Sequence, residues 1–140
     1  FLEKDSLHNL PQRFSGRVMR RICAIPRDGG SRGSLPASQV LECHRQRDGF
    51  FDVYGRMRWD DVSPTITAGV YTPSKGRFIH PDDDRCISLR EAAVFQSFPR
   101  TYKFPIEIGK MQLALLIGNA LPPAFIRLHA VALRRALERI

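Results

Sequence analysis

The strongest constraint on the fold is a helix signature that begins at Ser88 and ends before Pro99. Ser88 and Glu91 have the spacing of a capping box. In this motif the serine hydroxyl accepts from a backbone N–H of the first turn, and the glutamate carboxylate accepts from the backbone N–H of the cap. Pro99 cannot continue a helix. The pattern therefore predicts a helix over residues 88–97.

Two further helices are predicted nearer the end of the chain. Residues 108–117 are followed by Gly118, a residue typical of the position just past a helix, and Pro122 and Pro123 then open a third helix over residues 123–139. Its apolar positions follow steps of four, three, four and three: Ile126, Ala130, Leu133, Leu137 and Ile140. This spacing gives the helix one apolar face and predicts that it packs against another surface.

Several stretches, taken in order, resemble the cytosine-C5 DNA methyltransferases. Residues 54–59 and 64–67 are similar to the end of the target-recognition region of that family. Residues 85–104 are similar to its ninth signature block, and residues 117–123 to its tenth. Leu121 stands where the family usually has Val, and Arg100 where it usually has Asp. The resemblance implies the C-terminal part of such an enzyme. Residues 1–84 would form the target-recognition, DNA-binding region and residues 85–140 a helical segment.

The blocks that carry the chemistry of that family do not occur in these 140 residues. The family nucleophile is the cysteine of a Pro-Cys pair, and its thiolate attacks a base flipped out of the DNA stack. Here the three cysteines follow Ile22, Glu42 and Arg85. A Glu-Asn-Val motif, a Gly-rich cofactor turn and a Gln-x-Arg-x-Arg block are also absent. No catalytic residue is therefore assigned, and the chain alone is expected to transfer no methyl group.

Two interpretations of this partial resemblance stay open. In one, the chain is a C-terminal fragment or subunit of a DNA (cytosine-5-)-methyltransferase from a restriction-modification system. The catalytic N-terminal half would then lie in the same polypeptide or in a separate chain. In the other, it is a stand-alone basic DNA-binding or scaffold module derived from such an enzyme. The first residue is Phe1 rather than Met, which favours a piece of a longer polypeptide over a processed or tagged small protein.

The charge of the chain indicates a polyanionic partner. Its 22 Lys and Arg exceed 14 Asp and Glu, giving a net charge of +8, and clustered cations favour phosphate contacts. Contacts with double-stranded DNA are predicted at three places. They are Arg17 and Arg20 on a helix over residues 12–22, Arg56 and Arg58 in an extended segment, and Thr65 and Thr67 in a β-branched segment. Composition alone explains a basic protein without a nucleic-acid role equally well. By resemblance, however, Thr65 matches a family threonine that touches the DNA backbone.

The resemblance also implies part of a cofactor site. In the family the asparagine of the tenth block lies beside S-adenosylmethionine, so Asn119 is assigned to cofactor binding, with Ala120 and Leu121 next to it. Without the resemblance, the sequence explains Asn119 as a turn-forming residue that ends a helix. Arg90 and Gln96, in the ninth block, are expected to support the scaffold rather than the chemistry.

The predicted fold class is α+β. Short irregular strands are expected within residues 38–54 and 64–71, and they precede the three helices. In the family such helices pack on an α/β domain that binds S-adenosylmethionine, and these 140 residues lack the sequence of that domain. The apolar face of the last helix would then be uncovered, which predicts self-association into a homo-oligomer.

The remaining features disfavour several classes of protein. Three cysteines without a Cys-x-x-Cys pair indicate a reducing, cytoplasmic compartment rather than a disulfide framework. No metal site is predicted, because Cys43 and His44 have no second ligand pair at a suitable spacing. No apolar run reaches the roughly 20 residues of a membrane span. Phe1 is not followed by the apolar segment of a signal peptide.

Overall fold

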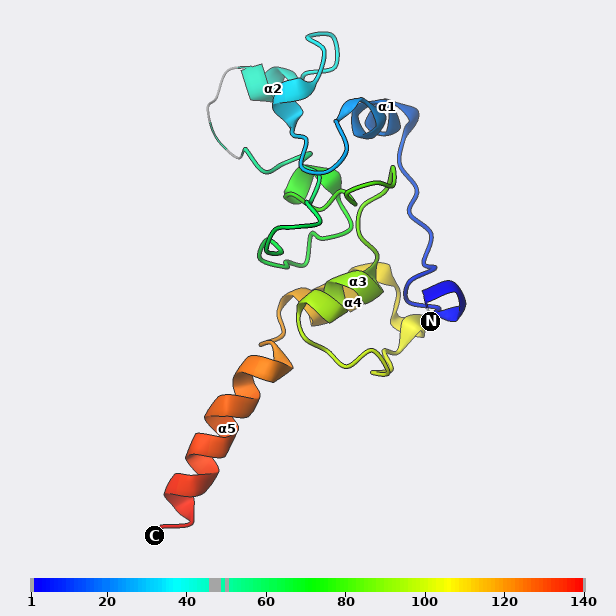
Figure 1. The fold of residues 1–140 in the computed structure, drawn as a ribbon. Helices are drawn as coiled ribbons and strands as arrows, with labels where there is room; N and C mark the ends of the chain where they lie inside the picture. Colours follow the sequence, from blue (N-terminus) through cyan, green and yellow to red (C-terminus); the bar gives the residue numbers. More distant parts are fainter. Residues whose placement is uncertain (1, 46–48, 50, 140) are drawn as a thin grey trace.

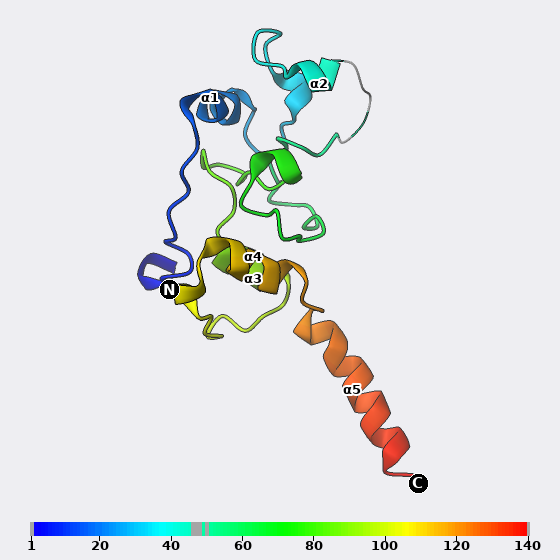
Figure 2. The same cartoon turned by 180° about the vertical axis from the view of Figure 1, so that it is seen from behind.

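The computed structural model describes residues 2–45, 49 and 51–139, and Figures 1 and 2 present it from opposite sides. Helices joined by long irregular segments make up the described residues. The α-helices are α1 (Gly16–Ala24), α2 (Glu42–Arg45), α3 (Leu89–Phe95), α4 (Lys110–Gly118) and α5 (Pro123–Leu137). Short 3-10 turns occur at Leu2–Lys4, Arg32–Ser34, Pro73–Lys75 and Ile106–Ile108.

The predicted helices are confirmed, and α3 has the predicted cap. Ser88 Oγ accepts from the Glu91 N–H at 3.1 Å, and Glu91 Oε2 accepts from the Ser88 N–H at 2.6 Å. The helix ends at Phe95, because Ser97 takes a left-handed backbone conformation with φ of 61°. α4 and α5 lie where the glycine and proline signals predicted them. α4 includes Gly118 as its last residue.

α1 begins four residues later than the predicted helix over residues 12–22. Ser15 caps it, since its Oγ accepts from the Val18 N–H at 3.4 Å. Gly16 is therefore in the first turn rather than in the interior, where it would cost about 1 kcal/mol relative to Ala. The helix ends at Ala24, before Pro26, as the proline predicts.

The small sheet predicted within residues 38–71 is a wrong prediction for the described part of the chain. Among the described residues, β-pairing is limited to two isolated bridges, Arg56 with Ile79 and Ile79 with Cys86, and only the first involves a residue within 38–71. Within residues 38–54, Glu42–Arg45 forms a helix, and residues 46–48 and 50 lie outside the described residues.

Residues 64–71 turn instead of forming the predicted strand. The Val70 N–H donates to the Thr67 carbonyl at 3.1 Å, and Thr67 Oγ1 accepts from the Gly69 N–H at 3.3 Å. β-Propensity depends on a neighbouring strand and a half-buried face. Because no described strand pairs with this segment, local turn hydrogen bonds satisfy its backbone instead.

Two buried apolar clusters hold the chain together. The first packs α3 and α4 against the segments before them: Leu7, Met57, Ile66, Val70, Phe78, Ile87, Leu89, Ala92, Ala93, Leu113, Ala114 and Ile117. The second lies beneath α1: Ile22, Ile25, Leu35, Tyr54 and Ile79. The first cluster contains residues from both sides of the boundary predicted after residue 84, which stays a prediction.

Residues 5–12 contact α3 and the residues just before it through polar side chains. Arg90 Nε donates to Asp5 Oδ2 at 2.9 Å. Gln12 and the backbone of Cys86 exchange two hydrogen bonds of 2.9 Å each. Residues 5–12 therefore belong to the same packed unit as the ninth block, although they are separated from it by more than 70 positions in sequence.

α5 projects away from the rest of the molecule in both views (Figures 1 and 2). It contains no buried residue, and Leu128 is 71% exposed. The predicted apolar position Ile140 lies outside the described residues. Among the described residues no single helix has the length and apolar content to cross a membrane. The pair α4 and α5, bent by 45°, passes by length and composition only.

Candidate DNA-recognition and cofactor-binding site

Arg56 lies in the interior of the predicted recognition region. Its side chain is 0% exposed, and its guanidinium donates to four backbone carbonyls and one carboxylate. The acceptors belong to Ile22, Ile25, His80, Asp83 and Asp84. An arginine has five N–H donors, so each one can be matched to an acceptor within the protein. The predicted DNA contact at Arg56 does not fit this placement, because the side chain has neither an exposed surface nor a spare donor.

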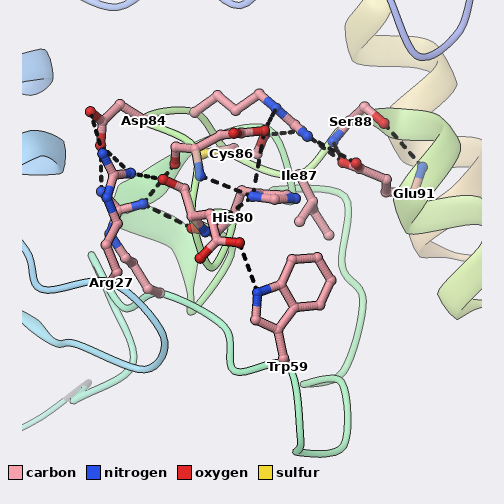
Figure 3. Close-up of polar contacts among 12 residues, drawn as sticks. Arg27, Trp59, His80, Asp84, Cys86, Ile87, Ser88 and Glu91 are labelled. Atoms are coloured by element: carbon pink, nitrogen blue, oxygen red, sulfur yellow. Dashed lines mark hydrogen bonds and ion pairs between the residues drawn. The ribbon is translucent and has the colours of Figure 1, made fainter. Parts of the chain in front are cut away.

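Asp84 compensates the buried charge of Arg56 and also pairs with Arg27, which is exposed. Its Oδ1 also lies 2.8 Å from Arg27 Nη1 (Figure 3). Burial alone would raise the pKa of Asp84, but hydrogen bonds from Arg27, Arg56 and Cys23 outweigh it and lower the pKa. A buried arginine is tolerated only with such a paired carboxylate and satisfied donors.

Trp59 is held at the surface by a loop rich in aspartate. Its indole Nε1 donates to Asp82 Oδ2 at 2.9 Å, and the His80 ring lies edge-on to it with 5.5 Å between ring centroids (Figure 3). His80 Nδ1 accepts from the backbone N–H groups of Asp82 and Asp83 at 3.2 and 3.0 Å. Burial lowers the pKa of His80, in keeping with a neutral ring whose Nδ1 is an acceptor. Trp59 remains 60% exposed.

A second polar cluster joins Arg85 to α3. Arg85 donates from both Nη atoms to the Glu91 carboxylate, at 2.7 and 2.9 Å, and Glu91 also accepts from the Ser88 N–H (Figure 3). Burial alone would raise the pKa of Glu91, but these hydrogen bonds lower it to about 2. His8 Nδ1 lies 2.8 Å from Ser88 Oγ. The cluster fixes the start of α3 and leaves Ser88 buried as a cap.

Gln96 and Ser97 hold the turn that contains the predicted cofactor residues. Gln96 Nε2 donates to the carbonyls of Ile117 and Ala120 at 3.1 and 3.4 Å. Ser97 Oγ accepts from the Ala124 N–H at 3.0 Å. The end of the ninth block therefore sets the shape of the tenth, in agreement with a scaffold role for Gln96.

Gly118 packs this turn against the segment that contains Thr65 and Thr67, here called the threonine segment. A Cβ built on Gly118 would overlap the backbone nitrogen of Ala68 and the carbonyl carbon of Thr67, and would lie 2.8 Å from Ala68 Cα. Only a residue without a side chain allows so close an approach. Thr65 and Thr67 are exposed, as is Asn119 directly after Gly118. The structure thus places the backbone of Thr67, one of the two predicted DNA-contacting threonines, against the start of the predicted cofactor turn.

Asn119 and Leu121 present open surface at that turn. The Asn119 N–H donates to the Leu115 carbonyl at 3.0 Å, while its side chain is exposed. Leu121 is 63% exposed. An amide next to an apolar side chain fits one edge of a cofactor that has polar and apolar parts.

The predicted DNA-contacting arginines other than Arg56 are exposed. Arg58 lines a polar cavity of about 410 Å³ together with Ser31 and Arg77. Arg17 and Arg20 lie on α1, which is separated from α4 in both overall views (Figures 1 and 2). The structure therefore distributes the predicted DNA-contacting residues between two parts of the molecule and does not gather them into one site.

Cys23 and Cys86 lack the lowered pKa of an activated nucleophile. Cys86 is buried, and burial raises its pKa to about 12. Burial and the neighbouring Asp84 raise the pKa of Cys23. A cysteine nucleophile reacts as the thiolate, which a raised pKa disfavours. Within the described ranges, no group of three or more His, Cys, Asp or Glu could hold a metal ion.

Comparison with known proteins identifies the family. The family model of the C-5 cytosine-specific DNA methylases matches residues 17–135. The chain belongs to this family. It is 43% identical over 142 residues to Type II methylase M.HgiDII of Herpetosiphon aurantiacus, covering 97% of the chain and 39% of that protein.

Other methylase relatives are similar over shorter stretches. Type II methyltransferase M.AgeI of Thalassovita gelatinovora is 43% identical over 106 residues, which are 76% of the chain and 24% of that protein. DNA (cytosine-5)-methyltransferase 3 of Arabidopsis thaliana is 37% identical over 100 residues, 71% of the chain and 7% of that protein. The chain thus spans well under half the length of each of these methylases.

Several residues that build this part of the methylase fold were not predicted. Asp84 compensates Arg56 across 28 positions, and Arg85 pairs with Glu91 across six. Neither spacing marks a helix or a strand, so the sequence carried no local signal for them. Trp59 was more accessible to prediction, because a lone tryptophan between Arg58 and Asp60 is typical of a surface aromatic with a polar partner.

Proposed function

We propose that this chain is the C-terminal part of a DNA (cytosine-5-)-methyltransferase of the restriction-modification kind. In this role it contributes target recognition on double-stranded DNA and one edge of the S-adenosylmethionine site. The methyl-transfer chemistry belongs to a catalytic N-terminal half, in the same polypeptide or in a separate chain.

The observation that carries the proposal is the contact between Gly118 and the backbone of Thr67 and Ala68. It supports the proposal because Gly118 directly precedes the exposed Asn119, and the backbone that it contacts carries the exposed Thr67. A methyltransferase must bring its DNA strand and its cofactor together, and this contact joins one candidate residue set for each. S-adenosylmethionine supplies the methyl group when bound, and Asn119, Ala120 and Leu121 are the residues that would contact it.

Two further observations favour a catalytic partner. The pKa values of Cys23 and Cys86 are raised, which disfavours the thiolate that the reaction requires. In addition, α5 presents its apolar side chains to solvent along its whole length. An uncovered apolar surface of this kind marks an interaction site, and the rest of the enzyme is the occupant that the proposal assigns to it.

The test combines DNA binding with methyl transfer. The chain is titrated into a fluorescent DNA duplex, and it is then incubated with labelled S-adenosylmethionine and duplex DNA. Both measurements are repeated with the separately expressed N-terminal part of M.HgiDII, its 43% identical relative. We expect salt-dependent DNA binding by the chain, no methylation by the chain alone, and methylation by the combination.

Two variants assign the roles of individual residues in the combined enzyme. Asn119→Ala should weaken cofactor binding with little change in duplex affinity. Thr65→Ala should weaken duplex binding with little change in cofactor affinity. Methylation by this chain alone would contradict the proposal. Binding of DNA without any restoration of methylation would favour a stand-alone DNA-binding module.

A further inference from the structure

A polar cavity lies between α1 and the turn that precedes α2. It has a volume of about 360 Å³ and is lined by Arg17, Arg20, Arg21, Ser38 and Gln39. The turn is closed by a hydrogen bond of 2.8 Å from the Gln39 N–H to the Pro36 carbonyl. Two separate parts of the chain thus form the cavity, and three arginines contribute to its lining.

The positive charge of this cavity is not compensated by its own lining. The lining contains no Asp or Glu. Among the described residues, Arg17, Arg20 and Arg21 form no ion pair, whereas Arg27 and Arg56 both pair with Asp84. Three arginines without a carboxylate favour an anionic ligand.

Arg21 gives the cavity a fixed wall. It is 8% exposed, its Nε donates to the Gln39 carbonyl at 2.8 Å, and its guanidinium lies over the Tyr54 ring at 6.0 Å. Arg17 and Arg20 are exposed on the same helix. The arrangement combines one immobilised guanidinium with two that can close on a ligand, so less conformational entropy is lost on binding.

Gln39 has one polar atom in the protein interior. Its Oε1 is buried and has no hydrogen-bond partner within the described part of the chain. The two orientations of an amide have the same shape, and the hydrogen-bonding partners decide between them. Because the Oε1 atom has no accessible surface, the amide does not offer it to a ligand, and the affinity of the cavity for an anion rests on its arginines.

We infer that this cavity binds a single phosphate of the DNA backbone, as an anchor separate from the threonine and Asn119 surface. The inference rests on the proposed function, since it assumes that the chain binds duplex DNA. Planar guanidinium groups bind phosphate oxygens through paired N–H donors. No aromatic side chain lines the cavity for stacking on a base. The site therefore adds affinity and register but reads no sequence.

The test compares two double variants that remove the same charge. Arg17→Gln with Arg20→Gln removes two exposed arginines from the cavity. Arg13→Gln with Arg127→Gln removes two exposed arginines outside it. Affinity for a fluorescent duplex is measured over a range of salt concentrations, after thermal unfolding has shown that both variants fold like the wild type.

We expect the cavity variant to bind the duplex about tenfold more weakly, with a salt dependence reduced by about one phosphate contact. The matched control should lose much less. Gln39→Glu places a carboxylate in the cavity without changing the side-chain shape, and it should weaken binding at least as much as the cavity double variant.

Several outcomes would overturn the inference. Equal losses in the two double variants would show a diffuse effect of charge. Wild-type duplex affinity in the cavity variant, together with binding of inorganic phosphate that depends on Arg17 and Arg20, would show a free-anion site only. Tighter binding to single-stranded RNA than to the duplex would assign the cavity to another nucleic acid.

If the wild-type chain binds no duplex at all, the proposed function fails first. If it binds and the variants bind equally well, only the cavity inference fails.

Discussion

Gln96 donates a hydrogen bond of 3.1 Å from its Nε2 to the backbone carbonyl of Ile117, 21 positions later in the chain. The bond is buried and connects the end of α3 to the last turn of α4. Through it the ninth block positions the tenth, including the exposed Asn119. Gln96 is thus a positioning residue, and its contribution can be separated from any direct contact with a ligand.

Replacing Gln96 by leucine should destabilise the fold. The Gln96→Leu variant keeps most of the side-chain volume but removes the side-chain donor to the Ile117 and Ala120 carbonyls, of which the Ile117 carbonyl keeps the Ala120 N–H at 3.4 Å. We expect the free energy of unfolding to fall by about 1–3 kcal/mol, measured by urea denaturation. Gln112→Leu, on the exposed face of α4, is the control and should change it by less than about 0.5 kcal/mol. Equal effects of the two substitutions would contradict the role given to Gln96.

Adding one methyl group at Gly118 should loosen the contact with the threonine segment. A Cβ there would overlap the backbone of Thr67 and Ala68, which cannot move aside as a flexible side chain can. We expect Gly118→Ala to lower the free energy of unfolding by about 1–3 kcal/mol, although alanine favours a helix. Gly16→Ala is the control, because its Cβ would meet only Arg20 Nη1, at an ordinary 3.7 Å. A Gly118→Ala variant as stable as Gly16→Ala would refute the close packing.

Arg56 and Arg58 should respond in opposite ways to substitution. Arg56→Met leaves buried carbonyls without donors and removes one of the two arginines that pair with Asp84, so the unfolding free energy should fall by about 3 kcal/mol or more. Arg58→Gln, at an exposed position, should change stability by less than about 0.5 kcal/mol and weaken duplex binding. Thermal unfolding and fluorescence anisotropy measure the two effects. Loss of DNA affinity in a stable Arg56→Met protein would show that Arg56 has a direct role in binding.

Stability should fall in acid through Glu91. Its pKa in the folded chain is about 2, below the ordinary 4.5. Its contribution is therefore fully present above pH 4.5 and is lost as the pH falls toward 2. The shift corresponds to about 3 kcal/mol. Urea denaturation at several pH values should show this slope in the wild type and its loss in Glu91→Gln. The same slope in both proteins would contradict the assignment.

His80 acts in a different pH window. Burial lowers its pKa from the ordinary 6.5, so its neutral form is favoured in the folded chain. Its contribution is present above pH 6.5 and is lost as the pH falls below that value. Burial also lowers the pKa of His44, so the part of a decline between pH 6.5 and 4.5 that disappears in His80→Gln reports His80, before Glu91 begins to contribute.

The uncovered face of α5 should drive self-association in the isolated chain. Leu133 and Leu137 are both exposed on this helix. Light scattering after size exclusion should show a mass above that of one chain, and Leu133→Glu with Leu137→Glu should shift it toward the monomer. Addition of the catalytic part of a relative should likewise displace the self-association. A wild-type chain that is monomeric at all concentrations would contradict the prediction.

The sequence alone determined the elements whose signals are local. The Ser88 and Glu91 capping box, Pro99 and the Pro122-Pro123 pair mark helix ends by hydrogen bonds and sterics within a few residues, so they specify α3 and α5 without knowledge of the rest. The same blocks carry the family resemblance. Residues close together in the sequence were therefore enough to predict these helices and to indicate the family.

Only the tertiary structure decided what the side chains between these elements do. Arg56 and Arg58 look alike in sequence, yet one is buried among five acceptors and the other is exposed. The β-branched residues 64–71 suggested a strand, but without a described strand beside them they turn. Burial and strand pairing depend on residues 20 to 80 positions away, and no local pattern encodes those distances. The contact of Gly118 with Thr67, which joins the two halves of the candidate site, is of this kind.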